Sequence, residues 1–280
     1  MSQLKNFLTF IRFSHTLFAL PFALGSMVVA AHGWPGWPLF ALIIGCMVLA
    51  RTAAMSFNRI VDWEIDRRNP RTAKRQGLVK KGDAIFFCAL SALLFVVLTF
   101  LINQLCFWLA PGALILIFFY SLTKRCTHFA QFFLGLALAI SPLGAWIAVT
   151  GTLTWAPLVL AMGVMCWVAG FDIIYATQDM EIDQREGLYS MVVWLGAPRA
   201  LQLAGYLHLL LVFALLLFGW MSNAHLAYYL CLMPLPLVLF YEHRIAKTLQ
   251  LEAINRAFFQ TNVVVGFLFL IATCAGLYDL

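Results

Sequence analysis

Three polar side chains near residue 60 are spaced so that they can hold a cation. Asn58, Asp62 and Asp66 follow one another at intervals of four residues. At roughly 100° per residue, this spacing places them within about 80° of one another on one helix face. One amide and two carboxylates in a row are hard oxygen ligands, the type that Mg²⁺, Mn²⁺ and Ca²⁺ prefer. The row therefore predicts a divalent-cation site.

A second carboxylate cluster lies later in the chain and contains Asp172, Tyr175, Asp179 and Asp183. If one helix continues through this segment, its three aspartates fall within about 40° of one another. Tyr175 then lies on the Asp179 side, where its hydroxyl can orient a phosphate or a carboxylate. A single carboxylate in such a place is as readily explained as a polar helix end that meets water. Five aspartates on two helix faces instead repel one another unless a cation is present.

The two clusters together suit a particular kind of ligand. Mg²⁺ is usually held by one or two carboxylates together with substrate phosphates, not by a cage made of protein alone. Two carboxylate faces opposed across a cavity therefore predict a diphosphate that is bound through Mg²⁺.

Basic residues near both clusters fit the same ligand. Lys124 and Arg125 end an apolar segment, and Arg71, Lys74 and Arg75 follow the first cluster. Ammonium and guanidinium groups bind the phosphate oxygens that a metal leaves uncovered. The alternative interpretation of these basic residues is that they only anchor the cytoplasmic ends of membrane helices.

The composition indicates what positions these residues. Hydrophobic residues make up 63% of the 280 residues and charged residues only 11%, too apolar for a soluble domain. We expect an all-α membrane protein, with the whole chain, 1–280, forming one domain. Nine transmembrane helices of about 20 residues each are predicted at 14–31, 38–57, 84–102, 107–122, 129–149, 156–175, 200–220, 225–241 and 258–277.

The distribution of basic residues predicts the orientation of these spans. Seventeen of the 18 Lys and Arg residues fall in connections on one side, and the remaining one, Arg51, lies within a span. The positive-inside rule places that side, the N-terminus and both carboxylate clusters in the cytoplasm, and the C-terminus outside. The net charge of +6 is thus explained by topology, and we expect membrane lipid but no nucleic acid as a partner.

At its carboxylate clusters the sequence resembles the UbiA superfamily of intramembrane aromatic prenyltransferases. Asn58, Asp62 and Asp66 match the family motif NxxxDxxxD. The later segment matches a DxxxD motif preceded by a tyrosine and an earlier aspartate, and the stretch ending in Lys124 and Arg125 resembles a Tyr-x-x-x-Lys-Arg element. The resemblance covers nearly the whole chain, because the family fold also has nine helices with motifs after the second and sixth.

The resemblance implies a function and a role for each residue. It implies Mg²⁺-dependent transfer of a polyprenyl group from polyprenyl diphosphate to an aromatic acid in a bacterial inner membrane, with the active site facing the cytoplasm. Asp62, Asp66, Asp179 and Asp183 would be catalytic and, with Asn58, would bind the metal. Substrate would be bound by Asn58, Arg51, Lys124, Arg125, Tyr175, Asp172, Arg71 and Arg75.

Two further stretches resemble the quinone-pathway branch of this superfamily: the run that begins at His15 and the run from Arg51 to Arg59. Acceptors in that branch are 4-hydroxybenzoate, for ubiquinone, and 1,4-dihydroxy-6-naphthoate, for menaquinone, and the two stretches resemble the second group somewhat more. Arg51 lies about 20° from Asn58 on a helical wheel, so it can hold the acceptor carboxylate or pair with the aspartates. His15 can contact substrate or form a buried hydrogen bond.

Other functions stay open at this point. Haem or chlorophyll precursors are acceptors in other branches of the superfamily. A lipid diphosphatase would use the same metals with a water nucleophile. A cation transporter would place acidic groups along an ion path, whereas the carboxylates here gather at one face of the membrane.

Overall fold

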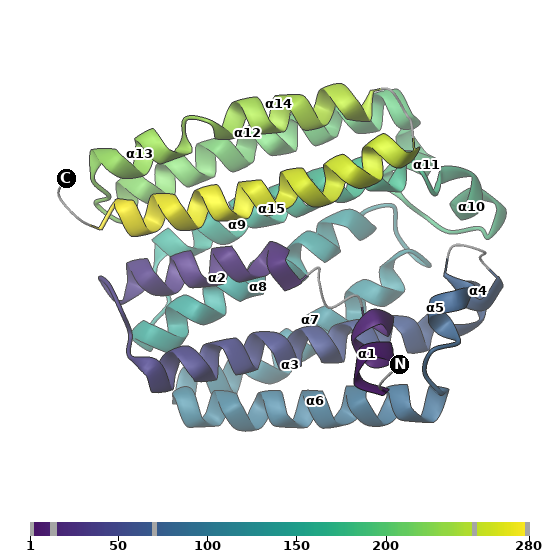
Figure 1. Ribbon diagram of the computed structural model, residues 1–280, viewed down its shortest axis with the longest axis horizontal. Helices are drawn as coiled ribbons and strands as arrows, with labels where there is room; N and C mark the ends of the chain where they lie inside the picture. Colours follow the sequence, from purple (N-terminus) through teal and green to yellow (C-terminus); the bar gives the residue numbers. More distant parts are fainter. Residues whose placement is uncertain (1–2, 12–15, 69–71, 248–250, 278–280) are drawn as a thin grey trace. The chain divides into compact units, whose positions relative to one another are not determined.

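The structure, a computed structural model (Figure 1), describes residues 3–11, 16–68, 72–247 and 251–277, with only the backbone described at a few positions inside these ranges. Every regular element in them is a helix. Seven helical segments in this part of the chain are long and apolar enough to cross a membrane. Two of the nine expected spans correspond to shorter apolar stretches, Phe18–Ala30 and Phe259–Ala275. The all-helical prediction is confirmed, and the span count of nine and the orientation stay predictions.

The helix boundaries lie within a few residues of the expected spans except at the last span, where α15 begins at Leu251. The helices are α1 (Gln3–Phe10), α2 (Thr16–Ala30), α3 (Trp37–Val61), α4 (Trp63–Arg68), α5 (Ala73–Gln76), α6 (Lys81–Ile102), α7 (Gln104–Thr123), α8 (Ala130–Thr150), α9 (Trp155–Ala176), α10 (Met180–Arg185), α11 (Met191–Leu195), α12 (Ala197–Met221), α13 (Leu226–Leu232), α14 (Leu235–Ala246) and α15 (Leu251–Ala275).

The expected span at 225–241 is interrupted. Helix α13 ends at Leu232 and α14 begins at Leu235, and the two helices together make one span-length apolar segment. Pro234 lies at the interruption and has no backbone N–H to continue the hydrogen-bond ladder. Met233 and Pro234 both keep right-handed helical dihedral angles, so the missing donor interrupts the hydrogen bonding without redirecting the chain.

The helices form two compact units. The first unit comprises Met1–Thr16 and Trp37–Leu122, and the second comprises Leu17–Gly36 and Thr123–Leu280. The first cluster belongs to the first unit, whereas Lys124, Arg125 and the second cluster belong to the second. The expectation of a single domain over 1–280 stays a prediction.

In the first unit, α3 and α6 lie side by side along their length (Figure 1). They approach closely at Gly45, where a Cβ atom would lie 2.7 Å from Cδ1 of Leu98. Cys46, Phe95 and Ala110 form a buried cluster between α3, α6 and α7. Near the other end of α3, Phe10 of α1 packs in a second buried cluster around Met55. This packing fixes the end of α3 that carries the first carboxylate cluster.

In the second unit, α9 is the central helix and packs against both α8 and α12. About 67% of its most apolar stretch is buried, compared with 22–39% in the other six span-length helices. Glycines permit this contact. A Cβ atom at Gly135 would lie 2.5 Å from the Met165 carbonyl oxygen, and one at Gly163 would lie 2.8 Å from Cβ of Ala214.

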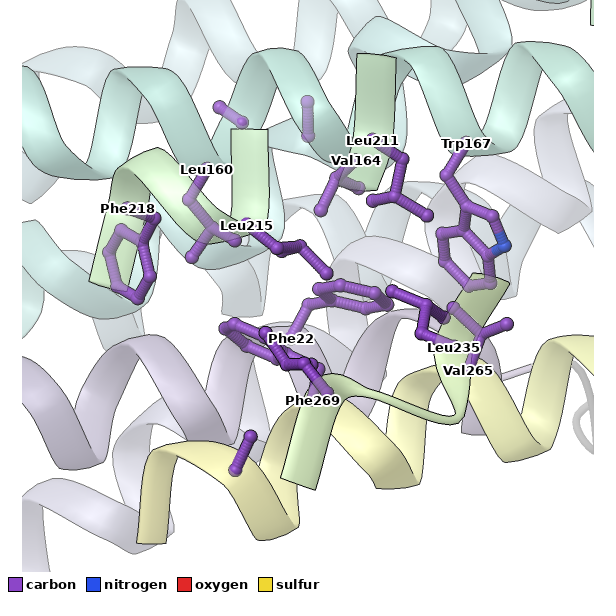
Figure 2. Packing of buried hydrophobic residues seen from close by; sticks show 14 of the residues in the cluster. Phe22, Leu160, Val164, Trp167, Leu211, Leu215, Phe218, Leu235, Val265 and Phe269 are labelled. Atoms are coloured by element: carbon purple, nitrogen blue, oxygen red, sulfur yellow. The ribbon is translucent and has the colours of Figure 1, made fainter. Parts of the chain in front are cut away.

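Aromatic side chains fill the core of the second unit. Phe22 stacks on Phe269 with ring centroids 4.9 Å apart, and it lies 4.8 Å from the Trp167 ring (Figure 2). All three side chains are fully buried. Because such large rings each remove much apolar surface from contact with lipid or water and pack in defined orientations, they hold α2, α9 and α15 together.

Candidate active site

The first carboxylate cluster lies where α3 passes into α4. Helix α3 ends at Val61, and Asp62 is in a turn before α4 begins at Trp63. The hydrogen-bond spacing nevertheless continues, because Asp62 N–H donates to the Asn58 carbonyl (3.0 Å) and Asp66 N–H donates to the Asp62 carbonyl (2.8 Å). These i→i−4 contacts preserve the expected four-residue spacing of Asn58, Asp62 and Asp66 across the interruption.

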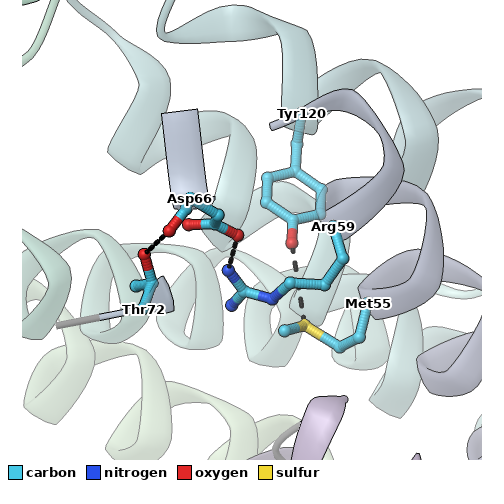
Figure 3. A network of polar contacts seen from close by, with 5 residues as sticks. All are labelled: Met55, Arg59, Asp66, Thr72 and Tyr120. Carbon is cyan, nitrogen blue, oxygen red and sulfur yellow. Dashed lines mark hydrogen bonds and ion pairs between the residues drawn. The ribbon is translucent and has the colours of Figure 1, made fainter. Parts of the chain in front are cut away.

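Asp66 is held on both its side chain and its backbone (Figure 3). The Arg59 guanidinium donates through Nη1 to Oδ2 of Asp66 at 2.6 Å, and both side chains are only 10% exposed. The Thr72 hydroxyl donates to the Asp66 backbone carbonyl at 2.7 Å. The neighbouring Tyr120 hydroxyl contacts the Met55 sulfur at 3.9 Å. The last carboxylate of the first motif is therefore fixed by an ion pair within its own cluster.

The second cluster departs from the expected single helix. Helix α9 ends at Ala176, Asp179 lies at the N-cap position of α10, and α10 begins at Met180. The residues between form tight turns, in which Gln178 N–H donates to Tyr175 and Asp179 N–H donates to Ala176, three residues back. The expectation that Asp172, Asp179 and Asp183 share one continuous helical face is wrong.

The structure nevertheless brings the second cluster together with Lys124. Asp183 N–H donates to the Asp179 carbonyl at 2.8 Å, so these two aspartates are one turn apart. Nζ of Lys124 lies 3.8 Å from Oδ2 of Asp183. Half-buried Asp172, near the end of α9, interacts electrostatically with Lys124, Asp179 and Asp183. Four of the predicted site residues thus share one electrostatic environment.

Asp183 presents a buried carboxylate oxygen within the second cluster. It is 3% exposed, and its Oδ2 atom is buried with no hydrogen-bond donor among the described residues. Burial raises the pKa of Asp183, and Asp179 raises it further, whereas the Lys124 ammonium and the Ser190 hydroxyl lower it. A buried carboxylate oxygen that lacks a donor is costly unless it is protonated or meets a cation.

Ser190, on the segment after α10, lies beside Asp183 and is held there by contacts with α11 and α8. Its hydroxyl accepts a hydrogen bond from Val193 N–H and thereby caps α11. The adjacent Met191 N–H donates to the buried Gln131 side chain of α8 at 3.3 Å. The His128 ring stacks on Trp194, with centroids 5.5 Å apart. These contacts attach the segment after α10 to the beginning of α8 and keep Ser190 beside Asp183.

The remaining predicted residues divide into three groups. Arg51 on α3 and Tyr175 on α9 are half-buried, and Arg125 is exposed. Lys74 is exposed on the short helix α5. Arg71, His15 and the Arg75 side chain lie outside the described part of the chain. The roles expected for these residues stay predictions.

The donors present suit a hard divalent cation. Both clusters offer carboxylate and amide oxygens, and Asp183 presents a buried oxygen that no described donor satisfies, which is the ligand chemistry of Mg²⁺. In the described residues, no three His, Cys, Asp or Glu side chains are close enough to hold a metal ion. Protein-bound Mg²⁺ commonly completes its coordination with substrate phosphates and water, so fewer carboxylates suffice in each cluster.

Two residues beside the clusters were missed by sequence reasoning. Arg59 was considered only as a positive-inside residue and as the end of the run from Arg51, although its position seven residues before Asp66 placed it on the same helix face. Ser190 carries the signal of a helix N-cap, because it precedes an apolar run. No sequence pattern indicated its proximity to Asp183.

Comparisons with known proteins identify the family to which this chain belongs. A model of the UbiA prenyltransferase family matches residues 19–271. A 4-hydroxybenzoate octaprenyltransferase of Aeromonas hydrophila subsp. hydrophila is 30% identical, over 91% of this chain and 89% of the relative. The apo structure of a UbiA homolog from Aeropyrum pernix K1 is 26% identical, with a TM-score of 0.82 over 91% of this chain and 95% of that one.

A further solved structure extends the likeness of fold. A UbiA homolog from Archaeoglobus fulgidus, bound to GPP and Mg²⁺, has a TM-score of 0.73 and 21% identity, over 97% of this chain and 99% of that one. Seven span-length helices and the family match make this chain an integral membrane protein. Because the family model covers the sequence from before the first motif to beyond the second, the chain belongs to the UbiA prenyltransferase family of enzymes.

Proposed function

We propose that this enzyme transfers a polyprenyl group from polyprenyl diphosphate to an aromatic acid, with 4-hydroxybenzoate as its acceptor, in the synthesis of a respiratory quinone. The observation that carries the proposal is the row formed by Asn58, Asp62 and buried Asp66 in a chain that belongs to a prenyltransferase family. The second cluster, with Lys124 beside Asp183, supplies further oxygen ligands and a cation for phosphate.

The carboxylate clusters are assigned to the metal and the diphosphate. Mg²⁺, when bound, supplies positive charge that stabilises the diphosphate as it leaves. Asn58 and four aspartates are the proposed metal ligands; the aspartates are Asp62, Asp66, Asp179 and Asp183. The Archaeoglobus fulgidus homolog is bound to GPP and Mg²⁺, which supports a prenyl diphosphate and Mg²⁺ as the bound species.

The basic and hydroxyl groups are assigned to the reacting diphosphate. Lys124, Arg125, Arg71 and Arg75 bind its oxygens while the bond between prenyl C1 and oxygen breaks and the electron pair leaves with diphosphate. Asp172 and Tyr175 orient the diphosphate end of the donor. The aromatic ring then forms a bond to C1, and loss of a ring proton restores aromaticity.

Arg51 is assigned to the acceptor. A guanidinium binds a carboxylate through two parallel hydrogen bonds, and Arg51 lies on α3 two turns before Asn58. The name of the Aeromonas relative supports 4-hydroxybenzoate. The other candidate is 1,4-dihydroxy-6-naphthoate, which has a carboxylate in common with it and leads to menaquinone.

The apolar helices around the site protect the allylic cation from water. The apolar helices exclude water, which would otherwise capture the allylic cation, and the long prenyl tail extends into the lipid. Basic residues flank both clusters, and this supports a bacterial inner membrane with the active site at its cytoplasmic face.

A product assay tests the proposal. Membranes containing the protein are supplied with radiolabelled polyprenyl diphosphate, Mg²⁺ and either aromatic acid, and a matched reaction contains EDTA. The expected result is a prenylated 4-hydroxybenzoate that EDTA abolishes. Prenylation of the naphthoate alone would reassign the pathway.

The same assay separates the other functions. Release of free prenol without an aromatic product would indicate a lipid diphosphatase or a different acceptor, such as a haem or chlorophyll precursor. A donor that is not consumed would overturn the proposal and favour transport of a cation.

A further inference from the structure

Arg59 lies inside the first carboxylate cluster, one residue after Asn58, and its side chain points at the last member of that cluster (Figure 3). Nη1 of Arg59 lies 2.6 Å from Oδ2 of Asp66, and each side chain is only 10% exposed. Removing one partner of such a buried pair leaves the other charge without compensation. The contact therefore fixes Asp66 far more firmly than a surface ion pair would.

The contact also spans the interruption between α3 and α4. Arg59 belongs to α3 and Asp66 to α4, and the Thr72 hydroxyl holds the Asp66 backbone from the segment that follows. Arg59 uses one oxygen of the carboxylate. A carboxylate has two oxygens and about four lone-pair positions, so Asp66 retains capacity to bind a cation while it keeps its hydrogen bond to Arg59.

We propose that Arg59 is the positioning residue of the cation site: it orients the Asp66 carboxylate and compensates its charge until Mg²⁺ binds. Hydrogen-bonding partners of metal-binding carboxylates strengthen metal binding because they fix the ligand in a productive orientation. This inference rests on the proposed function only in taking Mg²⁺ with diphosphate as the ligand of the cluster.

Two effects of Arg59 on the metal have opposite signs. Its positive charge repels a cation, whereas its orientation of Asp66 favours one. The proposal requires the orienting effect to be the larger, so removal of the guanidinium must weaken metal binding. This direction separates a positioning residue from a guanidinium that merely competes with the metal for Asp66.

The direct test measures metal binding, without turnover. Mn²⁺ binding to the full-length protein in detergent is followed by electron paramagnetic resonance in the presence of inorganic diphosphate. Arg59→Gln is expected to raise the Kd for Mn²⁺ about 10- to 100-fold. Arg67→Gln is the matched control, because exposed Arg67 lies directly after Asp66 and carries the same charge; its Kd should stay within about twofold of wild type.

A double-mutant cycle shows whether Arg59 acts through Asp66. In an Asp66→Asn background, Arg59→Gln should change the Kd by less than about twofold, because the ligand that it orients is gone. Arg59→Lys keeps the charge but lacks the planar fork, so its Kd should be intermediate. This variant also keeps the test decisive if Arg59→Gln does not fold.

Specific outcomes overturn the inference. Unchanged or tighter Mn²⁺ binding in Arg59→Gln would show that orientation of Asp66 does not govern the metal. An undiminished effect of Arg59→Gln in the Asp66→Asn background would show that Arg59 acts elsewhere. If metal binding depends on Arg59 but no aromatic product forms, the inference stands and the proposed function fails. If product forms while the Kd of Arg59→Gln equals that of wild type, the inference fails and the proposed function stands.

Discussion

The ammonium nitrogen of Lys124, directly after α7, lies 3.8 Å from Oδ2 of Asp183 on α10. This separation suits an ion pair but exceeds hydrogen-bond length, and the Asp183 side chain is 4% exposed. The pair therefore places the proposed phosphate-binding ammonium group beside a buried carboxylate that is a proposed metal ligand.

Asp183→Asn should lower kcat for prenyl transfer about 100-fold or more, because the amide keeps the shape but removes the metal-binding charge. Thermal unfolding in detergent should stay close to that of wild type, because the substitution removes a buried charge but leaves the side-chain volume unchanged. Glu181→Gln is the control, because its side chain is 87% exposed on the same helix. Wild-type turnover in Asp183→Asn would contradict the assignment of the second cluster.

Removal of the metal should stop the reaction, and Asp62→Asn should have the same consequence at all Mg²⁺ concentrations. Asp62 is the proposed middle ligand of the first row, and Mg²⁺ is usually held by only one or two carboxylates. Prenyl transfer is measured after EDTA treatment and again after Mg²⁺ is restored. The exposed neighbour Glu64 provides the control variant, Glu64→Gln. EDTA-resistant product formation would exclude the metal-dependent mechanism.

Ser190→Ala should shift the acidic limb of Mn²⁺ binding to higher pH. Burial raises the pKa of Asp183 and the Ser190 hydroxyl lowers it, so without the hydroxyl a higher pH is needed before the carboxylate loses its proton and binds metal. Binding is followed between about pH 4 and pH 8, above the ordinary aspartate pKa of about 3.9. The control is Ser222→Ala, which removes a buried hydroxyl at the end of α12.

The same pKa shift affects the free energy of unfolding, with a defined sign. Because the pKa of Asp183 is higher in the folded protein than in the unfolded chain, the folded state holds this proton more tightly. The contribution of Asp183 to stability is therefore present at low pH and is lost as pH rises through its folded pKa.

An acidic limb of Mn²⁺ binding that does not move in Ser190→Ala would show that the hydroxyl has no effect on Asp183.

Gly135→Ala should destabilise the second unit by about 1–3 kcal/mol, the usual result of forcing an extra methyl group into a packed interior. The new Cβ atom would lie 2.5 Å from the Met165 carbonyl oxygen, a backbone atom that cannot turn away. Gly144→Ala on the same helix is the control, because no atom lies within 4 Å of its Cβ position. Equal unfolding temperatures for the two variants would contradict the close contact of α8 and α9.

Arg51→Lys should raise the KM for the aromatic acid about tenfold, because an ammonium lacks the planar fork that matches a carboxylate. The KM for polyprenyl diphosphate should change much less. Arg244→Lys, at an exposed position on α14, controls for the substitution itself. An unchanged acceptor KM would remove Arg51 from the acceptor site.

Sequence reasoning predicted the membrane class and the position of the first cluster because both depend on local patterns. Apolar runs mark spans regardless of their partners. The spacing of Asn58, Asp62 and Asp66 survives the end of α3, because the i→i−4 hydrogen bonds continue through Asp62.

The second cluster was harder to predict because its geometry depends on contacts from distant segments. Thr177 and Gln178 contain no proline or glycine signal, yet α9 stops before them. Asp183 is reached by Lys124 and Ser190 from elsewhere in the chain, and helical periodicity carries no information about such contacts. The interruption before α14 was not predicted, because 225–241 was expected to form one span, although Pro234 is a local signal for such a break.

The deep burial of α9 has a consequence for biogenesis. In the finished protein its neighbours shield about 67% of its most apolar stretch, so little of that stretch faces lipid. Its composition is nevertheless as apolar as a lipid-exposed span requires, because a helix must partition into the bilayer before its neighbours surround it. Helix α9 is thus surrounded first by lipid, when the translocon inserts it, and then by protein, after assembly. A polar substitution that the assembled protein tolerates would therefore still impair insertion into the lipid.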